Sequence, residues 1–134
     1  MTLAGCDLVA FVATTDLARA NAFYVTTLGL PVIEENPYAC VCDANGTVLR
    51  ITAVDALTVA PSTVLGWTVP DIVAAVAGLV DRGVTFDRFE GMAQDGLGVW
   101  IAPGGARVAW FRDPDGNRLS VTQAPESAGG TIPQ

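Results

Sequence analysis

Short runs of alternating apolar and polar residues predict strands along this chain, and two stretches with apolar residues at helical spacing interrupt them. A first strand is predicted over 8–13, and Asp16 is placed to cap a helix that Gly29 ends. Three further strands are then expected, over 31–35, 38–43 and 48–53. Between the last two, Asn45 and Gly46 favour a hairpin, because both residues tolerate a positive φ. The first half is therefore predicted to be a β-α-β-β-β module.

The second half repeats this order after a linker over 54–62. A strand is expected over 63–69, and Asp71, which stands 55 positions after Asp16, is placed to cap a helix that runs to about Arg82 and that Gly83 stops. Four more strands are expected, over 85–88, 98–102, 107–111 and 118–123. The glycine-rich segment 91–97 is expected to be a flexible loop that borders a pocket. The chain thus consists of two equivalent modules.

Length and composition indicate a single compact domain in residues 1–123 of the 134, followed by a mobile tail over 124–134. Apolar residues make up 51% of the chain and charged residues 16%, which favours a globular protein with an extensive buried surface. The apolar stretch 72–80 is too short to span a bilayer, and no basic start precedes an apolar run at the N-terminus. We therefore expect no membrane association, no secretion signal and a cytoplasmic location.

The net charge of −7 argues against nucleic acid and anionic membranes as partners, because both require a basic surface. The charge is compatible with cationic small molecules, and equally with solubility alone. The three cysteines are an odd number at poor spacing for a disulfide framework or a zinc site. Cys40 and Cys42 are expected to share one face of a strand as free buried thiols.

Three segments carry a resemblance to a known family. The first is the helix sequence Asp-Leu-Ala-Arg-Ala-Asn-Ala-Phe-Tyr at 16–24 with Leu-Gly-Leu at 28–30. The second is Val-Pro-Asp at 69–71, where the other helix starts, and the third is Trp-Phe-Arg-Asp-Pro-Asp-Gly-Asn at 110–117. In this order they resemble the vicinal oxygen chelate superfamily, which includes glyoxalase I, bleomycin-resistance proteins, fosfomycin-resistance enzymes and extradiol dioxygenases. The segment 113–117 is interpreted as a tight turn before the last strand.

The resemblance implies an α+β fold in which two modules, 7–53 and 63–123, form curved mixed sheets around a cavity that dimerisation completes. In the metal enzymes of the family, four side chains hold a divalent ion, and the matching positions here are Val9, Arg50, Val64 and Ser120. Valine offers no lone pair, arginine repels a cation, and a lone serine hydroxyl binds divalent metals weakly. The chain also contains no histidine. We therefore expect no metal and no other cofactor.

The resemblance and the aromatic content together give a set of candidate ligand-binding residues. This set comprises Val9, Phe11, Arg50, Val64, Trp67, Trp100, Trp110 and Ser120. Arg50 could grip an anionic ligand group, pair with an acidic side chain of its own fold, or point out through a dimer contact. The aromatic residues could line a cleft for a planar ligand or pack in the core. Arg50 favours an anionic ligand whereas the net charge favours a cationic one, so the ligand remains open.

The leading functional hypothesis is metal-independent binding of a small organic molecule in a cavity between the modules, as in the bleomycin-resistance branch, by a homodimer. The alternative is a metal-free isomerase or lyase of the same superfamily that acts on a small metabolite. Tyr24, Tyr38 or a carboxylate could then carry the proton, but no spacing singles out an acid–base pair, so no catalytic residue is assigned. A third possibility is a structural or regulatory domain whose cavity the tryptophans fill. A binding protein is favoured over a metal-dependent lyase or dioxygenase.

Overall fold

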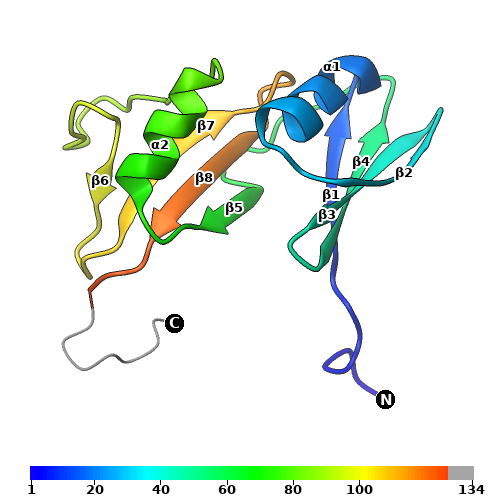
Figure 1. The fold of residues 1–134 in the computed structure, drawn as a ribbon, viewed down its shortest axis with the longest axis horizontal. Helices are drawn as coiled ribbons and strands as arrows, with labels where there is room; N and C mark the ends of the chain where they lie inside the picture. Colours follow the sequence, from blue (N-terminus) through cyan, green and yellow to red (C-terminus); the bar gives the residue numbers. More distant parts are fainter. Residues whose placement is uncertain (127–134) are drawn as a thin grey trace. The chain divides into compact units, whose positions relative to one another are not determined.

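The computed structural model describes residues 1–126 and divides into two compact units, Met1–Val59 and Ala60 onward (Figure 1). The predicted tail lies outside the described residues from position 127 on. Each unit contains one four-stranded mixed sheet, and the strand order is the same in both. The duplication that the helix caps and apolar runs predict is therefore present as two equivalent β-α-β-β-β units.

Unit 1 has the predicted order of elements. These are β1 (Val9–Thr14), α1 (Leu17–Asn21), the π-helical η1 (Ala22–Thr27), β2 (Val32–Asn36), β3 (Ala39–Ala44) and β4 (Thr47–Ala53). The sheet order is β1-β4-β3-β2, with β1 parallel to β4 and the other pairs antiparallel. The predicted hairpin joins β3 to β4 through Asn45 at φ 53° and Gly46 at φ 94°. Positive φ at both central residues is what a two-residue hairpin turn of type I′ requires.

The two faces of this sheet differ sharply in burial. One face carries Leu49, Ile51, Cys40 and Cys42, all at most 1% exposed. The helical segment covers this face, because Asn21 donates to Glu35, whose cross-strand partner is Cys40. The opposite face carries no helix of unit 1, and we call it open face 1.

The first helix differs from the regular helix that the sequence predicts. From Ala22 onward it is π-helical, with the Leu28 N–H donating to the Phe23 carbonyl, five residues back, at 2.8 Å. A π turn accommodates one more residue than an α turn. Over so short a segment, the spacing of the apolar residues does not distinguish an α-helical from a π-helical period. The cap itself is as predicted, because the Asp16 carboxylate accepts from the Arg19 N–H at 3.1 Å.

Unit 2 repeats the arrangement with shorter outer strands. Its elements are β5 (Leu65–Thr68), α2 (Ile72–Asp81), β6 (Trp100–Ile101), β7 (Arg107–Arg112) and β8 (Arg118–Gln123). The sheet order is β5-β8-β7-β6, and β5 runs parallel to β8. The strand expected over 85–88 is wrong, because only Phe86 forms a bridge, to Phe111. The strand expected over 98–102 is reduced to two residues.

The core of unit 2 lies between α2 and one face of its sheet. On α2, Ile72 and Val76 are fully buried, and so is the β8 residue Leu119. As predicted, the Asp71 carboxylate caps α2 by accepting from the Ala74 N–H at 3.2 Å. We call the sheet face opposite α2 open face 2. Within the described part of the chain, no helix has the length and apolar character that a membrane span requires.

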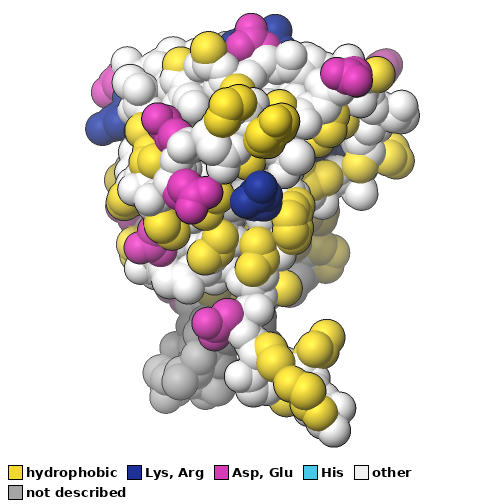
Figure 2. All heavy atoms as spheres, turned by 90° about the vertical axis from the view of Figure 1, so that its right-hand side faces the viewer, with side chains coloured by type: hydrophobic (Ala, Val, Ile, Leu, Met, Phe, Trp, Pro, Cys, Tyr) yellow, Lys and Arg dark blue, Asp and Glu magenta, His cyan; other side chains and the backbone are white. Residues whose placement is uncertain are grey.

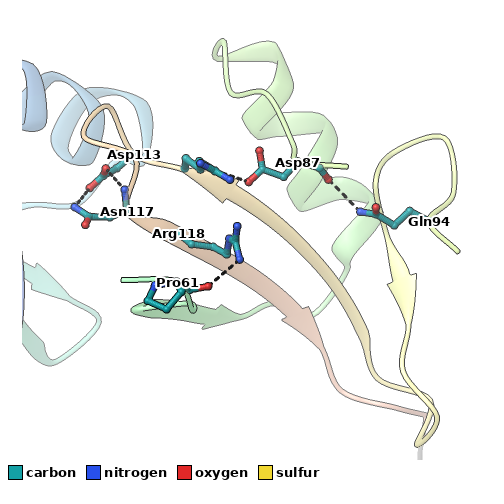
Figure 3. A network of polar contacts seen from close by, with 7 residues as sticks. Pro61, Asp87, Gln94, Asp113, Asn117 and Arg118 are labelled. Carbon is teal, nitrogen blue, oxygen red and sulfur yellow. Dashed lines mark hydrogen bonds and ion pairs between the residues drawn. The ribbon is translucent and has the colours of Figure 1, made fainter. Parts of the chain in front are cut away.

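The segment between α2 and β6, expected to be a flexible loop, is held by a dense set of hydrogen bonds. The Gln94 side chain accepts from the Phe89 N–H at 2.8 Å and donates to the Gly98 carbonyl. It also donates to the Asp87 carbonyl, the contact drawn in Figure 3. One carboxylate oxygen of Asp95 accepts from two further backbone N–H groups of the segment. A single amide and a single carboxylate thus organise a glycine-rich segment whose composition alone favours flexibility.

Candidate functional site

Open face 1 brings together the predicted residues Val9, Phe11 and Arg50. Phe11 pairs with Arg50 across β1 and β4, and Arg50 pairs with Val41 on β3. Directly paired residues of neighbouring strands point to the same face. Phe11 is 64% exposed and Val9 42%. Figure 2 shows one side of the surface, on which apolar side chains are spread with charged ones scattered among them.

Arg50 is a half-buried cation on this apolar face, and no carboxylate neutralises it. Within residues 1–126 its guanidinium forms no ion pair and no hydrogen bond. The two acidic residues on the same face are engaged elsewhere. Glu34 accepts from the Asn36 side chain at 3.1 Å, and Asp43 accepts from the Gly46 N–H at 2.7 Å. The alternative in which Arg50 pairs with an acid of its own unit is therefore not realised.

Thr52 stands two residues beyond Arg50 on β4 and so shares open face 1. Its hydroxyl oxygen is buried and has no hydrogen-bond partner among the described residues. A buried hydroxyl without a partner is costly, by roughly 1–3 kcal/mol. Sequence reasoning missed Thr52, although its spacing from Arg50 places it on the same face of the strand.

Open face 2 carries Val64 and Ser120, the other two positions that the resemblance matches to family metal ligands. Ser120 pairs with Gly66 on β5 and with Trp110 on β7. A Cβ atom at Gly66 would lie 2.9 Å from the Ser120 hydroxyl oxygen, which places that hydroxyl directly over the glycine. Val64 precedes β5, and its N–H donates to the Arg118 carbonyl at 2.9 Å. Val64 and Gly66 share this face through the alternation of the strand.

An aromatic cluster, formed by Phe89, Trp100 and Trp110, extends over open face 2. The ring centroids of Trp100 and Trp110 lie 6.0 Å apart, and Phe89 meets Trp110 edge to face at 5.4 Å. The Arg118 guanidinium lies over the Phe89 ring, 5.0 Å from its centroid. The rings are inclined to one another, so they offer both ring faces and ring edges to a planar organic molecule, with a guanidinium beside them. All three are partly exposed. Sequence reasoning found the two tryptophans but missed Phe89 and Arg118.

Two arginines stand side by side on open face 2, and each has a polar partner. Arg112 and Arg118 are directly paired across β7 and β8. Arg112 forms an ion pair with Asp87 at 3.0 Å, and Arg118 donates to the Pro61 carbonyl at 3.2 Å (Figure 3). The Nε atom of Arg118 is buried without a hydrogen-bond partner in the described structure. These contacts offset the repulsion between the two neighbouring guanidinium groups.

Trp67 does not belong to this face. It pairs with Val121, which is 3% exposed, whereas the neighbouring Gly66 faces the Ser120 hydroxyl. Successive residues of a strand point to opposite faces, so Trp67 lies on the face that α2 covers. Alternation counted from Val64 would have given this result, because it places Gly66 and Thr68 with Val64 and excludes Trp67.

The residues at the metal positions do not fit a divalent ion. Val9 and Val64 have no donor atom, Arg50 is a cation, and Ser120 alone is a weak ligand. Among the described residues, no group of three or more histidine, cysteine, aspartate or glutamate side chains is arranged to hold a metal. The donor chemistry of these four positions therefore disagrees with the metal site that the fold implies.

The thiols lie apart from both open faces. Cys40 and Cys42 are fully buried under the helical segment, as free thiols whose sulfur atoms are 3.9 Å apart. Burial raises the pKa of Cys42 to about 12 and also raises the pKa of Cys40. Both are therefore neutral thiols at pH 7, which are poor nucleophiles. The third cysteine, Cys6, is exposed.

The sequence profile of the Glyoxalase/Bleomycin resistance protein/Dioxygenase superfamily matches residues 6–121. The chain belongs to this superfamily. The resemblance carried by the two helix starts and by the turn at 113–117 is thereby confirmed. In that turn, Gly116 takes φ 90° and the Asp113 carboxylate accepts from two backbone N–H groups. No curated protein sequence matches the chain significantly.

Solved structures of the superfamily share the fold. A glyoxalase family protein from Bacillus anthracis is similar with a TM-score of 0.70 and 18% identity, over 92% of this chain and 97% of that one. A glyoxalase/bleomycin resistance protein/dioxygenase from Nocardioides gives a TM-score of 0.67 at 21% identity, over 95% and 88%. A lactoylglutathione lyase from Agrobacterium tumefaciens gives 0.65 at 18%, over 89% and 93%. The βαβββ modules are thus those of the glyoxalase fold.

Proposed function

We propose that this protein binds a small organic molecule without a metal, on the open faces of its sheets. The observation that carries the proposal is the aromatic cluster on open face 2. At the adjacent metal position stands Ser120, and around it the chain presents aromatic rings rather than ligand atoms. A partly exposed aromatic surface contributes to affinity through area and ring geometry, and it needs no ion.

Binding without chemistry is the mode of the bleomycin-resistance branch, and the proposal places this chain there. In that mode the protein lowers the free concentration of its ligand by holding it. The two tyrosines give no support to a proton-transfer reaction, because Tyr24 is fully buried in the core of unit 1 and Tyr38 is 75% exposed on the connection between β2 and β3. A homodimer in the cytoplasm is part of the same proposal.

A thermal-shift panel on the chelator-treated full chain tests this function. The panel contains nickel, zinc, manganese and iron salts, cationic glycopeptide drugs, aromatic carboxylates and common metabolites. A compound that binds only the folded state raises Tm, by an amount that grows with its concentration relative to Kd. We expect stabilisation by organic compounds and none by the metals. Stabilisation by a divalent metal, or by no member of the panel, would overturn the proposal.

Three tryptophan variants test which face of the sheet binds the ligand. Trp110→Phe and Trp100→Phe remove part of the aromatic cluster and are expected to weaken binding of a panel hit about two- to tenfold, because one ring contact contributes roughly 0.5–1.5 kcal/mol. Trp67→Phe is the matched control, since its ring lies on the face that α2 covers. An equal loss of affinity in all three variants would remove the assignment to open face 2.

A further inference from the structure

Arg50 combines three features that distinguish it from the other arginines of open faces 1 and 2. By the family resemblance it stands at a metal-ligand position, it lies on an exposed apolar face, and within residues 1–126 it has no polar partner. Arg112 is paired with Asp87, and Arg118 is bonded to Pro61 and stacked on Phe89. Arg50 therefore presents a guanidinium whose donors are all available.

A second hydrogen-bonding group stands beside it. The Thr52 hydroxyl is buried and unpartnered on the same face of the same strand. Residues two apart on a strand are separated by roughly 7 Å, a distance that the long arginine side chain can bridge. Apolar side chains surround the pair, with Phe11 and Val41 directly opposite Arg50 on the two neighbouring strands. Water competes less with a charged hydrogen bond in such surroundings than on a polar surface.

From these features we infer that the ligand carries an anionic group, a carboxylate, phosphate or sulfonate, which Arg50 binds on open face 1 with Thr52 beside it. The guanidinium supplies the positive charge that a metal ion supplies in the metal enzymes of the fold. Its planar fork matches two oxygen atoms of such a group. The inference rests on the proposed function in one respect only, namely that the protein binds a small organic molecule.

The net charge of −7 does not oppose this assignment. At physiological ionic strength, charges more than about 8 Å apart are largely screened. The charges that matter are those of the face itself, where Glu34 and Asp43 are each bonded to a group of their own segment. Both carboxylates keep their negative charge, but neither forms an ion pair with Arg50, so the guanidinium is available to an anionic group. This reasoning favours an anionic over a cationic ligand, the two alternatives that the sequence leaves open.

Three probes with one aromatic body and different charges test the inference by isothermal titration calorimetry. These are 2-naphthoate, its neutral amide 2-naphthamide, and the cationic naphthalen-2-ylmethanamine. We expect 2-naphthoate to bind the full chain at least tenfold more tightly than the other two, since a hydrogen-bonded charge pair is worth about one to two powers of ten in affinity. Equal affinities, tighter binding of the amide or the amine, or no binding by any probe would overturn the inference.

Substitutions at Arg50 test whether this residue causes the preference for the anionic probe. Arg50→Gln is expected to weaken 2-naphthoate binding about 10- to 100-fold and to leave the amide unchanged, whereas Arg50→Lys keeps the charge and loses less. Arg19→Gln is the matched control, because it removes the same charge from a side chain exposed on α1. A preference for the anion that survives Arg50→Gln, or that Arg19→Gln abolishes equally, would refute the role of Arg50.

Thr52→Val separates a ligand contact from a structural role. The substitution removes a buried hydroxyl without a partner, so we expect the ligand-free protein to melt at the same or a higher temperature while 2-naphthoate binds several-fold more weakly. Unchanged affinity would remove Thr52 from the site. The two proposals fail separately. A thermal-shift panel with only neutral or cationic hits overturns the anion site alone, whereas a panel without any organic hit overturns the proposed function as well.

Discussion

Single residues decide what each open face can bind, because the strands beneath them are alike in the two units. Arg50 and Ser120 occupy corresponding positions, on β4 and β8, the second strands in the order of the two sheets. One presents a cation and the other a small hydroxyl. Their strand partners also differ, since Phe11 faces Arg50 whereas Gly66 faces Ser120. The chemistry of each face thus depends on two or three side chains placed by backbone register.

The Ser120 hydroxyl lies in the space that a Cβ atom at position 66 would enter. Gly66→Ala would bring that atom to 2.9 Å from the hydroxyl oxygen, so we expect a loss of about 1–3 kcal/mol in the free energy of unfolding. Urea denaturation measures this loss. The double variant Gly66→Ala/Ser120→Ala removes the clash and is expected to recover most of the stability. If the two substitutions are simply additive, the proposed contact does not account for the effect.

Because its thiol is buried, Cys42 is expected to lower the free energy of unfolding at alkaline pH. The pKa of Cys42 is about 12 in the folded protein against 9.0 for an unperturbed thiol, so between these values the unfolded state loses a proton that the folded state keeps. Stability is therefore unaffected at pH 7 and falls as pH rises above about 9, at up to roughly 1.4 kcal/mol per pH unit. Urea denaturation between pH 7 and 10.5 measures the decline. Cys42→Ala is expected to reduce the slope, and an unchanged slope would contradict the assignment.

At the scale of elements, the sequence predicts local structure well where a short-range rule applies. The capping aspartates, the Asn45-Gly46 hairpin and the turn at Gly116 each depend on two to five neighbouring residues, and all are confirmed. The strand expected over 85–88 fails because its pairing depends on a distant residue, Phe111, and reaches it at one position only. Composition makes segment 91–97 resemble a flexible loop, whereas Gln94 makes contacts that composition does not reveal.

For the candidate site, too, short-range patterns predict some residues and long-range contacts determine the others. Alternation along a strand correctly groups Val9 with Phe11 and would have excluded Trp67. Phe89 could not be found in this way, because it lies outside any strand and reaches Trp110 through the fold of its segment. Likewise, no pattern in the sequence shows that the Thr52 hydroxyl lacks a partner. Whether that hydroxyl has a partner depends on all the residues around it in the folded structure.

Helix α2 offers a direct test of the capping rule. Its first turn contains no acidic residue, and the Asp71 side chain accepts from the Ala74 N–H. Asp71→Ala is expected to lower the free energy of unfolding by about 1 kcal/mol, whereas Asp71→Ser keeps an oxygen acceptor and loses less. Urea denaturation of the two variants beside the parent chain measures both values. Equal losses would show that the carboxylate acts through charge rather than as a cap.

At the scale of the whole molecule, two units of the same fold each carry their own core and their own open face. The segment before β1, outside open face 1, exposes Leu3 by 82% and Leu8 by 74%. Apolar surface of this kind is often covered by a partner. A second copy of the chain is the partner that the superfamily resemblance favours, and the proposed homodimer accounts for the exposure.

Sedimentation velocity checks the proposed dimer. We expect a species of about twice the 13.9 kDa mass of the chain at micromolar concentration, in the absence of any metal or ligand. Leu8→Glu, which places a charge on the exposed apolar segment, is expected to shift the distribution towards monomer. Glu126, an exposed residue of unit 2, offers a control through Glu126→Gln. A parent chain that sediments as a monomer throughout this range would reject the homodimer.

The parallel pairing within each unit has a consequence for the order of folding. The strands β7 and β8 meet through a connection of a few residues, and so do β3 and β4, whereas β5 must find β8 across more than forty intervening residues. Closing a long loop costs more chain entropy than closing a short one and takes longer. We therefore expect these two hairpins to form first and the parallel edge strands β1 and β5 to be added last. Pulse-labelled hydrogen exchange should show protection of Leu119 and Leu49 before that of Trp67, and the reverse order would exclude this route.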